Sequence, residues 1–288
     1  MDIGSLLAGG KNEHDVAASG SIVLILGSAP DAVRAAQWAK LPGLKIVCIN
    51  NAWKIRNDWD YLVVPEDFPS DRYPPSCQIG QRIIEAADFV PSNNRFGGIV
   101  YAGATMAFTA GYWALATLRP KILAYLGCDM IYNGPRTHFY GQGTPDPLRE
   151  DVTLGSLEAK SARIMAIAAA NNCSCVNLSE NTESRLLFPR VKYDDLKSGL
   201  PAPIVNDSIF DKAKMAEQAL GYMVEDGKYW ESCHSFDGNA LAEIDRLWLQ
   251  SVGRSDFEGL IGGNLSGGSS DRFGTPDQIR QDQSASGS

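Results

Sequence analysis

The stretch Ser21-Ile22-Val23-Leu24-Ile25-Leu26-Gly27-Ser28-Ala29-Pro30-Asp31 decides the fold class of this chain. Its continuous aliphatic run is typical of a strand that is buried on both faces, as in a parallel sheet. The run ends in a turn of small residues, Gly27, Ser28 and Ala29, directly before a stretch with a helical pattern. Such a turn lets a ligand approach backbone N–H groups at a helix N-terminus, or it only lets the helix pack close to its strand. Both alternatives stay open at this point.

Strands and helices alternate along the rest of the chain. We expect strands at 22–26, 45–49, 61–64, 121–126 and 174–178, and helices at 32–40, 81–87, 104–118, 154–171, 205–224 and 239–252. Segment 68–98 contains four prolines, so apart from its short helix we expect it to be irregular. The order predicts an α/β fold: a Rossmann-like, doubly wound, mostly parallel sheet with helices on both faces, followed by C-terminal helices.

Composition divides the chain into four parts. Residues 1–20 are expected to form a flexible N-terminal arm, and residues 21–192 a Rossmann-like nucleotide-binding core. Residues 193–252 are expected to form a helical C-terminal extension. Residues 253–288 are rich in Gly, Ser, Asp and Gln, which is typical of a disordered tail.

Charge and cysteine content limit the classes of partner. The 288 residues carry a net charge of −8, which argues against a protein that coats nucleic acid or an anionic membrane. The six cysteines show no zinc-ligand spacing, so we expect a reduced, cytoplasmic protein without a metal site. No signal peptide and no apolar run of 18 residues is recognisable, and we expect the apolar segment 102–118 to be a buried helix.

Polar residues follow each expected strand at the point where it ends. Because parallel strands bring their carboxyl ends to one edge of the sheet, these residues predict a small-molecule site there. The residues concerned are Ser28, Asn50 and Asn51, Glu66 and Asp67, Asp129, and Ser179. Asn50 and Asn51 could contact a ribose or base through their amides, and Asp129 could hold a ribose hydroxyl, a metal or only its own loop. The structural alternative is that each residue caps a helix or forms a turn.

The loop Tyr132-Asn133-Gly134-Pro135-Arg136-Thr137-His138-Phe139-Tyr140-Gly141 is the second informative segment. It follows the strand that ends before Asp129, and therefore lies on the side where a ligand is expected. A histidine in this position is suited to act as a general base. Arg136, Tyr132 and Tyr140 are suited to stabilise a phosphate leaving group. The alternative is a surface loop whose aromatic rings pack back onto the sheet.

Several common motifs are missing from the sequence. It contains no P-loop, no complete G-x-G-x-x-G after the first strand, no G-x-S-x-G elbow and no H-E-x-x-H. No D-x-D stands at a strand end, so a metal-dependent transferase site has no support. Lys160 and Arg163 share a face of the helix at 154–171, which is either solvated or adds positive charge near a phosphate.

Taken in order, the short motifs resemble those of the Campylobacter-type bacterial sialyltransferases and of the MptE-like (6-hydroxymethylpterin diphosphokinase-like) family. Gly27-Ser28-Ala29-Pro30 resembles their G-N-G-P-S turn, and Cys48-Ile49-Asn50-Asn51 resembles the C-N element of the second strand. Gly103-Ala104-Thr105 is similar to the T-S-G helix start, and Gly127-Cys128-Asp129 to the G-x-D strand end. His138-Phe139-Tyr140-Gly141 resembles the H-Y-x-G segment. The chain departs from the pattern at Ser28, Ala29 and the doubled asparagine.

This resemblance implies a metal-independent glycosyltransferase that moves a sugar, expected to be acidic and CMP-activated, onto a hydroxyl acceptor. It makes His138 the base and Tyr132 and Tyr140 phosphate ligands. It makes Ser28, Asn50, Asn51 and Thr105 nucleotide contacts, to which our own interpretation adds Gly27, Ala29 and Asp129. No cofactor is implied beyond the nucleotide-sugar co-substrate, and self-association stays open.

Two alternatives to this function remain. The first is an ATP- and Mg²⁺-dependent pyrophosphokinase-like transferase, which needs Glu66, Asp67 and Asp129 to converge on a metal. The second is a non-catalytic nucleotide-binding or assembly protein on the same fold, in which His138 turns away from the site.

Overall fold

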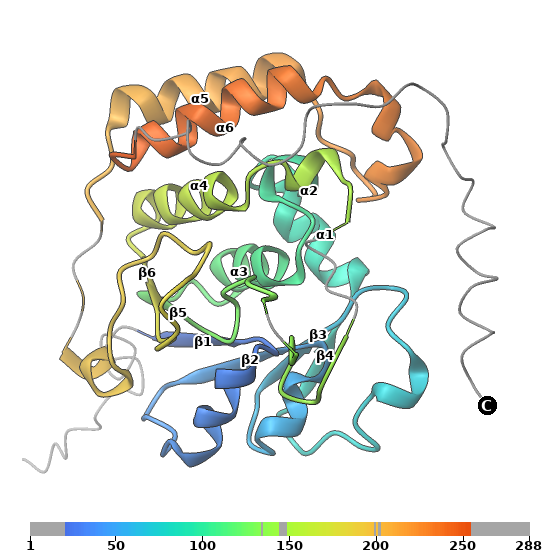
Figure 1. The fold of residues 1–288 in the computed structure, drawn as a ribbon, viewed down its shortest axis with the longest axis vertical. Helices are drawn as coiled ribbons and strands as arrows, with labels where there is room; N and C mark the ends of the chain where they lie inside the picture. The colour runs from blue at the N-terminus through green and yellow to red at the C-terminus, as the bar shows by residue number, and fades with distance from the viewer. Residues whose placement is uncertain (1–20, 134, 144–148, 199, 201–202, 255–288) are drawn as a thin grey trace, which may run out of the picture. The chain divides into compact units, whose positions relative to one another are not determined.

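The computed structural model describes residues 21–133, 135–143, 149–198, 200 and 203–254, and Figure 1 shows its fold. The expected N-terminal arm lies outside these residues, as does the expected tail from residue 255 onward. The described residues all belong to one compact unit. In this part of the chain, no helix is long and apolar enough to cross a membrane.

A six-stranded, entirely parallel sheet forms the centre of this unit, which confirms the predicted Rossmann-like α/β fold. The order across the sheet is β4-β3-β2-β1-β5-β6. The strands are β1 (Ile22–Leu26), β2 (Lys45–Ile49), β3 (Tyr61–Val63), β4 (Arg82–Ile84), β5 (Ile122–Leu126) and β6 (Ser174–Asn177). The aliphatic run from 22 to 26 is fully or almost fully buried, because β1 has neighbours on both sides and packed residues on both faces.

The strand order reverses beside β1. The chain moves outward from β1 to β4 in one direction, then returns to place β5 against the other side of β1 and β6 beyond it. Leu26 is therefore paired with Cys48 of β2 and with Leu126 of β5. In open α/β sheets, ligands bind outside the carboxyl ends of the strands at such a reversal.

Helices cover both faces of the sheet (Figure 1). One face carries α1 (Ala86–Asn94), α3 (Met106–Thr117) and α4 (Leu157–Ala170), together with the short α2 (Ile99–Ala102). On the other face the 3₁₀ helices η2 (Pro30–Gln37), η3 (Asn50–Ile55) and η7 (Tyr193–Ser198) bury small and aliphatic side chains against the sheet. Further 3₁₀ turns are η4 (Ser70–Arg72), η6 (Val152–Leu154), η8 (Tyr229–Glu231) and η9 (Cys233–Ser235).

The segment 68–98 is more regular than we expected. In place of a short helix at 81–87 it contains strand β4, paired in parallel with β3, and then helix α1. Pro91 lies inside α1 instead of ending it. β4 is only three residues long, which is too short for a periodic pattern to stand out. The helix expected at 32–40 also forms as a shorter 3₁₀ helix, η2.

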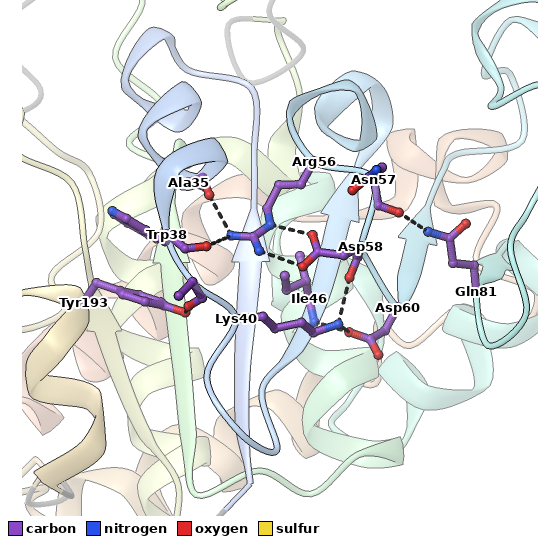
Figure 2. A network of polar contacts seen from close by, with 11 residues as sticks. Ala35, Trp38, Lys40, Ile46, Arg56, Asn57, Asp58, Asp60, Gln81 and Tyr193 are labelled. Atoms are coloured by element: carbon purple, nitrogen blue, oxygen red, sulfur yellow. Dashed lines mark hydrogen bonds and ion pairs between the residues drawn. The ribbon is translucent and has the colours of Figure 1, made fainter.

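A polar network fastens the short crossovers at the amino ends of β2 and β3 (Figure 2). The guanidinium of Arg56 donates two hydrogen bonds to Asp58, each 2.7 Å long. It also donates to the carbonyl oxygens of Ala35 and Trp38 in and after η2. Hydrogen bonding to Arg56 holds the pKa of Asp58 below its ordinary value. This network adds polar contacts to the buried alanines that hold η2 and η3 against the sheet.

The C-terminal helices α5 (Asp207–Leu220) and α6 (Gly238–Ser251) form a further layer over α4 (Figure 1). Buried ion pairs join the layers: Lys160 of α4 to Asp245 of α6 at 2.7 Å, and Arg163 of α4 to Glu217 of α5 at 2.6 Å. Neither alternative that we considered for Lys160 and Arg163 therefore applies. Their face of α4 is neither solvated nor near a phosphate site, because α5 and α6 cover it.

Candidate functional site

The turn after β1 is joined closely to the loop after β5. The N–H of Gly27 donates to the carbonyl oxygen of Leu126 at 2.8 Å, and the N–H of Ala29 donates to that of Gly127 at 3.0 Å. A side chain on Gly27 would overlap the Gly127 carbonyl and Cys128. Close approach of the loop after β5 therefore explains why residue 27 is a glycine. The N–H groups of Gly27 and Ala29 donate to that loop, and a contact of these two residues with a nucleotide stays a prediction.

Ser28 remains the accessible part of this turn. It is half-buried, and its N–H has no acceptor among the described residues. Its carbonyl oxygen accepts a 2.9 Å hydrogen bond from the N–H of Phe139. The loop after β5 thus folds back and lies directly against the end of β1.

His138 lies in a small hairpin at this contact. The N–H of His138 donates to the carbonyl of Gly141, and the N–H of Gly141 donates to that of His138, both at 3.0 Å. Gly141 has a φ of +123°, a conformation that favours glycine. Because Phe139 is bonded to Ser28, the hairpin brings His138 next to the carboxyl end of β1.

The imidazole of His138 is buried, with only 8% of its surface exposed. It stacks on Tyr140 at a ring distance of 5.0 Å and lies 6.0 Å from the ring of Tyr132. Nδ1 lies 2.9 Å from the Thr137 hydroxyl, whereas Nε2 has no partner among the described residues. Burial lowers the pKa of His138, so the ring is neutral near pH 7 and able to accept a proton at Nε2.

The structure places the rings of Tyr132 and Tyr140 next to the ring of His138. Tyr140 is exposed and Tyr132 is half-buried. Arg136 is exposed and makes no ion pair with a described residue. Tyr132, Tyr140 and Arg136 thus lie in the loop that carries His138.

Asn50 and Asn51 lie at the end of β2, beside the β1 turn. They follow Cys48, which pairs with Leu26, so Asn50 and Ser28 each stand two residues beyond a paired position. Asn50 adopts a left-handed φ of +51°, and Asn51 is 5% exposed. The amide oxygen of each is buried and receives no hydrogen bond from any described residue. A buried acceptor without a hydrogen bond is unusual, which makes this strand end a candidate ligand site.

Two of the expected contacts have structural roles. Thr105 caps α3: its hydroxyl accepts from the N–H of Phe108 at 3.4 Å and is buried. Asp129 holds the end of β6 and the segment that follows it, because its carboxylate accepts from three side chains there. The donors are Asn177 at 3.0 Å, Ser179 at 2.5 Å and Asn181 at 2.9 Å. Of the three roles considered for Asp129, anchoring a loop is the one that these bonds support.

Asp31 is a residue of this edge that the sequence did not single out. It lies in the first turn of η2, and both its carboxylate oxygens are buried without a hydrogen-bond donor in the described part of the chain. The hydroxyl of Ser179 lies beside it but donates its proton to Asp129. Burial raises the pKa of Asp31, and the nearby charge of Asp129 raises it further. The Ser179 hydroxyl and the Arg34 guanidinium act in the opposite direction, but the pKa stays above its ordinary value. In the sequence, an aspartate after a proline looks only like a helix start.

The acidic residues required by the ATP alternative do not come together. Glu66 and Asp67 follow β3, and both β2 and β1 lie between that strand and β5, which precedes Asp129. Glu66 and Asp67 are exposed, whereas Asp129 is buried. In the described ranges, no group of three or more His, Cys, Asp or Glu side chains could hold a metal ion.

A separate groove lies between α4 and α5. It is lined by the C-terminal turns of α4 and the start of α5, including Ala166, Ala170, Val205 and Phe210. Because α4 leads into β6, this end of α4 lies at the amino edge of the sheet. The groove is therefore distinct from the site at the strand ends.

Comparison with known proteins leaves this site to be judged on its own geometry. No protein-family model matches the chain, and no curated protein or solved structure matches it either.

Proposed function

We propose that this chain is a glycosyltransferase-like enzyme that transfers a sugar from a nucleotide donor to a hydroxyl acceptor without a metal ion. The donor is an acidic, CMP-activated sugar, as the resemblance of its motifs to the sialyltransferases implies. The donor nucleotide lies at the carboxyl ends of β1 and β2, and His138 is the base.

One observation carries this proposal. The hydrogen bond from Phe139 to Ser28 fastens the hairpin of His138 to the β1 turn. A neutral imidazole with an unpartnered Nε2 is thereby held next to the strand ends at which α/β proteins bind nucleotides.

The chemistry follows from these groups. Nε2 of His138 takes the proton from the acceptor hydroxyl as its oxygen forms a bond to the anomeric carbon of the sugar. The bond from that carbon to the phosphate oxygen breaks, and the electron pair leaves with the nucleotide. The hydroxyls of Tyr132 and Tyr140 and the guanidinium of Arg136 stabilise the departing phosphate. His138 then releases its proton to solvent.

A second candidate is a non-catalytic nucleotide-binding or assembly protein. The observations that favour it are the structural roles of Gly27, Thr105 and Asp129, which leave fewer groups free for a ligand. The ATP-dependent alternative receives less support, because the acidic side chains that it needs lie on separate strands.

A thermal-shift panel of CMP, CDP, UDP, GDP, ATP and S-adenosylhomocysteine, each with and without Mg²⁺, tests the proposal. A ligand at 100 times its Kd adds about 2.7 kcal/mol to the free energy of unfolding. We expect CMP to stabilise the chain without Mg²⁺. Stabilisation by ATP only with Mg²⁺ supports the pyrophosphokinase alternative, and no shift with any nucleotide supports the non-catalytic one.

A further inference from the structure

The edge proposed to bind the nucleotide holds several buried hydrogen-bond acceptors, and of the backbone donors in the β1 turn only the N–H of Ser28 has no acceptor among the described residues. Four side-chain oxygens are buried there without a hydrogen bond from a residue that the structure describes: both of Asp31 and one each of Asn50 and Asn51. These residues lie in the first turns of η2 and η3, two 3₁₀ helices that pack against each other beside the ends of β1 and β2. On the donor side, the N–H groups of Gly27 and Ala29 are already bonded to the β5 loop.

The charge at this edge is negative. Asp31 and Asp129 lie close enough to influence each other, and no described Lys or Arg forms an ion pair with either carboxylate. Arg34 lies near Asp31, but its guanidinium pairs with Glu180 at 2.5 Å and donates to the Leu178 carbonyl. Asp129 is satisfied by neutral donors, which leave its charge in place. A phosphate at the β1 turn would face the two carboxylates of Asp31 and Asp129, with the N–H of Ser28 as the backbone donor not bonded to a described residue.

We infer that the β1–β2 edge binds the nucleoside half of the nucleotide-sugar substrate, because the hydroxyl and amino groups of a nucleoside can donate hydrogen bonds to these buried oxygens. Asp31 is a specificity residue for this nucleoside half. The phosphate is directed to the hairpin side, where Tyr132, Tyr140 and Arg136 provide donors and positive charge. The inference rests on the proposed function, and it reverses the usual arrangement in which the first strand's turn cradles a phosphate. Asn51, with 5% of its surface exposed and an unpartnered oxygen, supports it independently of the acidic pair.

Calorimetric titration of wild type and Asp31→Asn tests the inference. The probes are whichever nucleotide stabilises the chain in the thermal-shift panel, the matching nucleoside without phosphate, and inorganic pyrophosphate. We expect wild type to bind the nucleoside and Asp31→Asn to lose roughly 10-fold or more in affinity for nucleoside and nucleotide alike, because a charged acceptor is removed. We expect pyrophosphate to bind no more weakly to the variant than to wild type.

The matched control is Asp71→Asn, because Asp71 also lies in the first turn of a 3₁₀ helix but is exposed. It removes the same charge and should leave all three titrations unchanged. Asp31→Ser serves as a second variant with a smaller side chain. The inference is overturned if Asp31→Asn binds the nucleotide more tightly, or if the nucleotide binds while its nucleoside does not. If no nucleotide binds wild type, it is the proposed function that fails, and the inference falls with it.

Discussion

The N–H of Phe139 donates to the carbonyl oxygen of Ser28 across 2.9 Å, so the hairpin of His138 is fastened to the turn that ends β1. These two residues are far apart in the sequence, and each follows a strand at the reversal of the strand order. The contact places the loop after β5 against the end of β1, and Ser28, Asn50 and Asn51 lie at the ends of β1 and β2.

His138→Gln should abolish most of the transfer activity. We expect kcat to fall about 10²- to 10⁴-fold, because a positioned general base contributes a factor of that size. The measurement is release of the nucleotide from a CMP-activated acidic sugar in the presence of a hydroxyl acceptor. His234→Gln is the control, since His234 is exposed in η9, and it should retain wild-type activity. Equal rates for His138→Gln and wild type would remove His138 from the mechanism.

The pH dependence of the same reaction follows from the burial of His138. A base works only when it is deprotonated, so activity should be lost as the pH falls through the pKa of the imidazole. Burial lowers that pKa, so the acid limb of kcat/KM should lie below the ordinary value of 6.5 and the rate should be level near pH 7. An acid limb above pH 7 would contradict this prediction.

Asp31→Asn should make the protein more stable near neutral pH. The raised pKa of Asp31 means that the folded state prefers the protonated carboxyl. Wild-type stability should therefore fall as the pH rises above 3.8, the ordinary value of this group, and the fall should stop once the folded carboxyl is ionised. Replacement by a neutral amide removes this loss, which is about 1 kcal/mol or more for a buried polar group without a partner.

Urea unfolding between pH 4 and pH 7 measures this effect. The difference between Asp31→Asn and wild type should be small at the acid end and largest at pH 7. Asp71→Asn should follow wild type throughout, because its carboxylate is exposed. A lower stability of Asp31→Asn at pH 7 would show that the carboxylate has a partner that stabilises its charge.

Glu217→Ala should be among the most destabilising substitutions on α5. Glu217 accepts hydrogen bonds from Arg163 and from the indole of Trp248, and all three side chains are buried. Burial alone would raise the pKa of Glu217, but Arg163 and Lys214 bring it below its ordinary value, so the carboxylate is charged. Its removal leaves a buried guanidinium unpaired, which costs about 3–5 kcal/mol.

Glu243→Ala provides the comparison, because Glu243 pairs with Arg246 on the exposed side of α6. The loss of an exposed pair costs about 1 kcal/mol at most. Equilibrium urea unfolding of both variants should separate the two classes clearly. If Glu217→Ala costs no more than Glu243→Ala, the α4–α5 ion pair does not hold the C-terminal layer in place.

Gly111 and Tyr125 should be coupled in a double-mutant cycle. A side chain on Gly111 of α3 would overlap the hydroxyl of Tyr125 in β5, and that hydroxyl is buried without a partner. Gly111→Ala should therefore destabilise the protein by about 1–3 kcal/mol, even though alanine favours a helix. Tyr125→Phe should be neutral or stabilising, since no hydrogen bond is lost.

The double variant Gly111→Ala/Tyr125→Phe should recover part of the stability lost in the single variant. Recovery should be incomplete, because the new methyl group would still lie 2.8 Å from Cδ1 of Ile164. Thermal and urea unfolding of the four proteins measure the coupling energy. Additive effects would mean that α3 moves away from the sheet in Gly111→Ala.

Several features could be predicted from the sequence because they depend on local order. Continuous aliphatic runs identified five of the strands, and the alternation of strands and helices predicted the parallel sheet that the structure confirms. The strand β4 was missed, because three residues at the edge of a sheet carry too little pattern. The aromatic cluster around His138 was also partly accessible from the sequence, since Tyr132 and Tyr140 lie within a few residues of it.

Other features depended on partners that are distant in the sequence. Lys160 and Arg163 looked like surface residues until α5 and α6 supplied Glu217 and Asp245 to bury them. Gly27 was predicted at a ligand site, and the structure adds that Gly127 and Cys128 lie too close to it for a side chain. The sequence by itself determined the sheet and the side of it on which a ligand is expected, because strand periodicity and connection rules are local. Only the tertiary structure decided which polar groups are free there, because hydrogen bonds between neighbouring strand ends use up some donors and leave the oxygens of Asp31 and Asn51 without one.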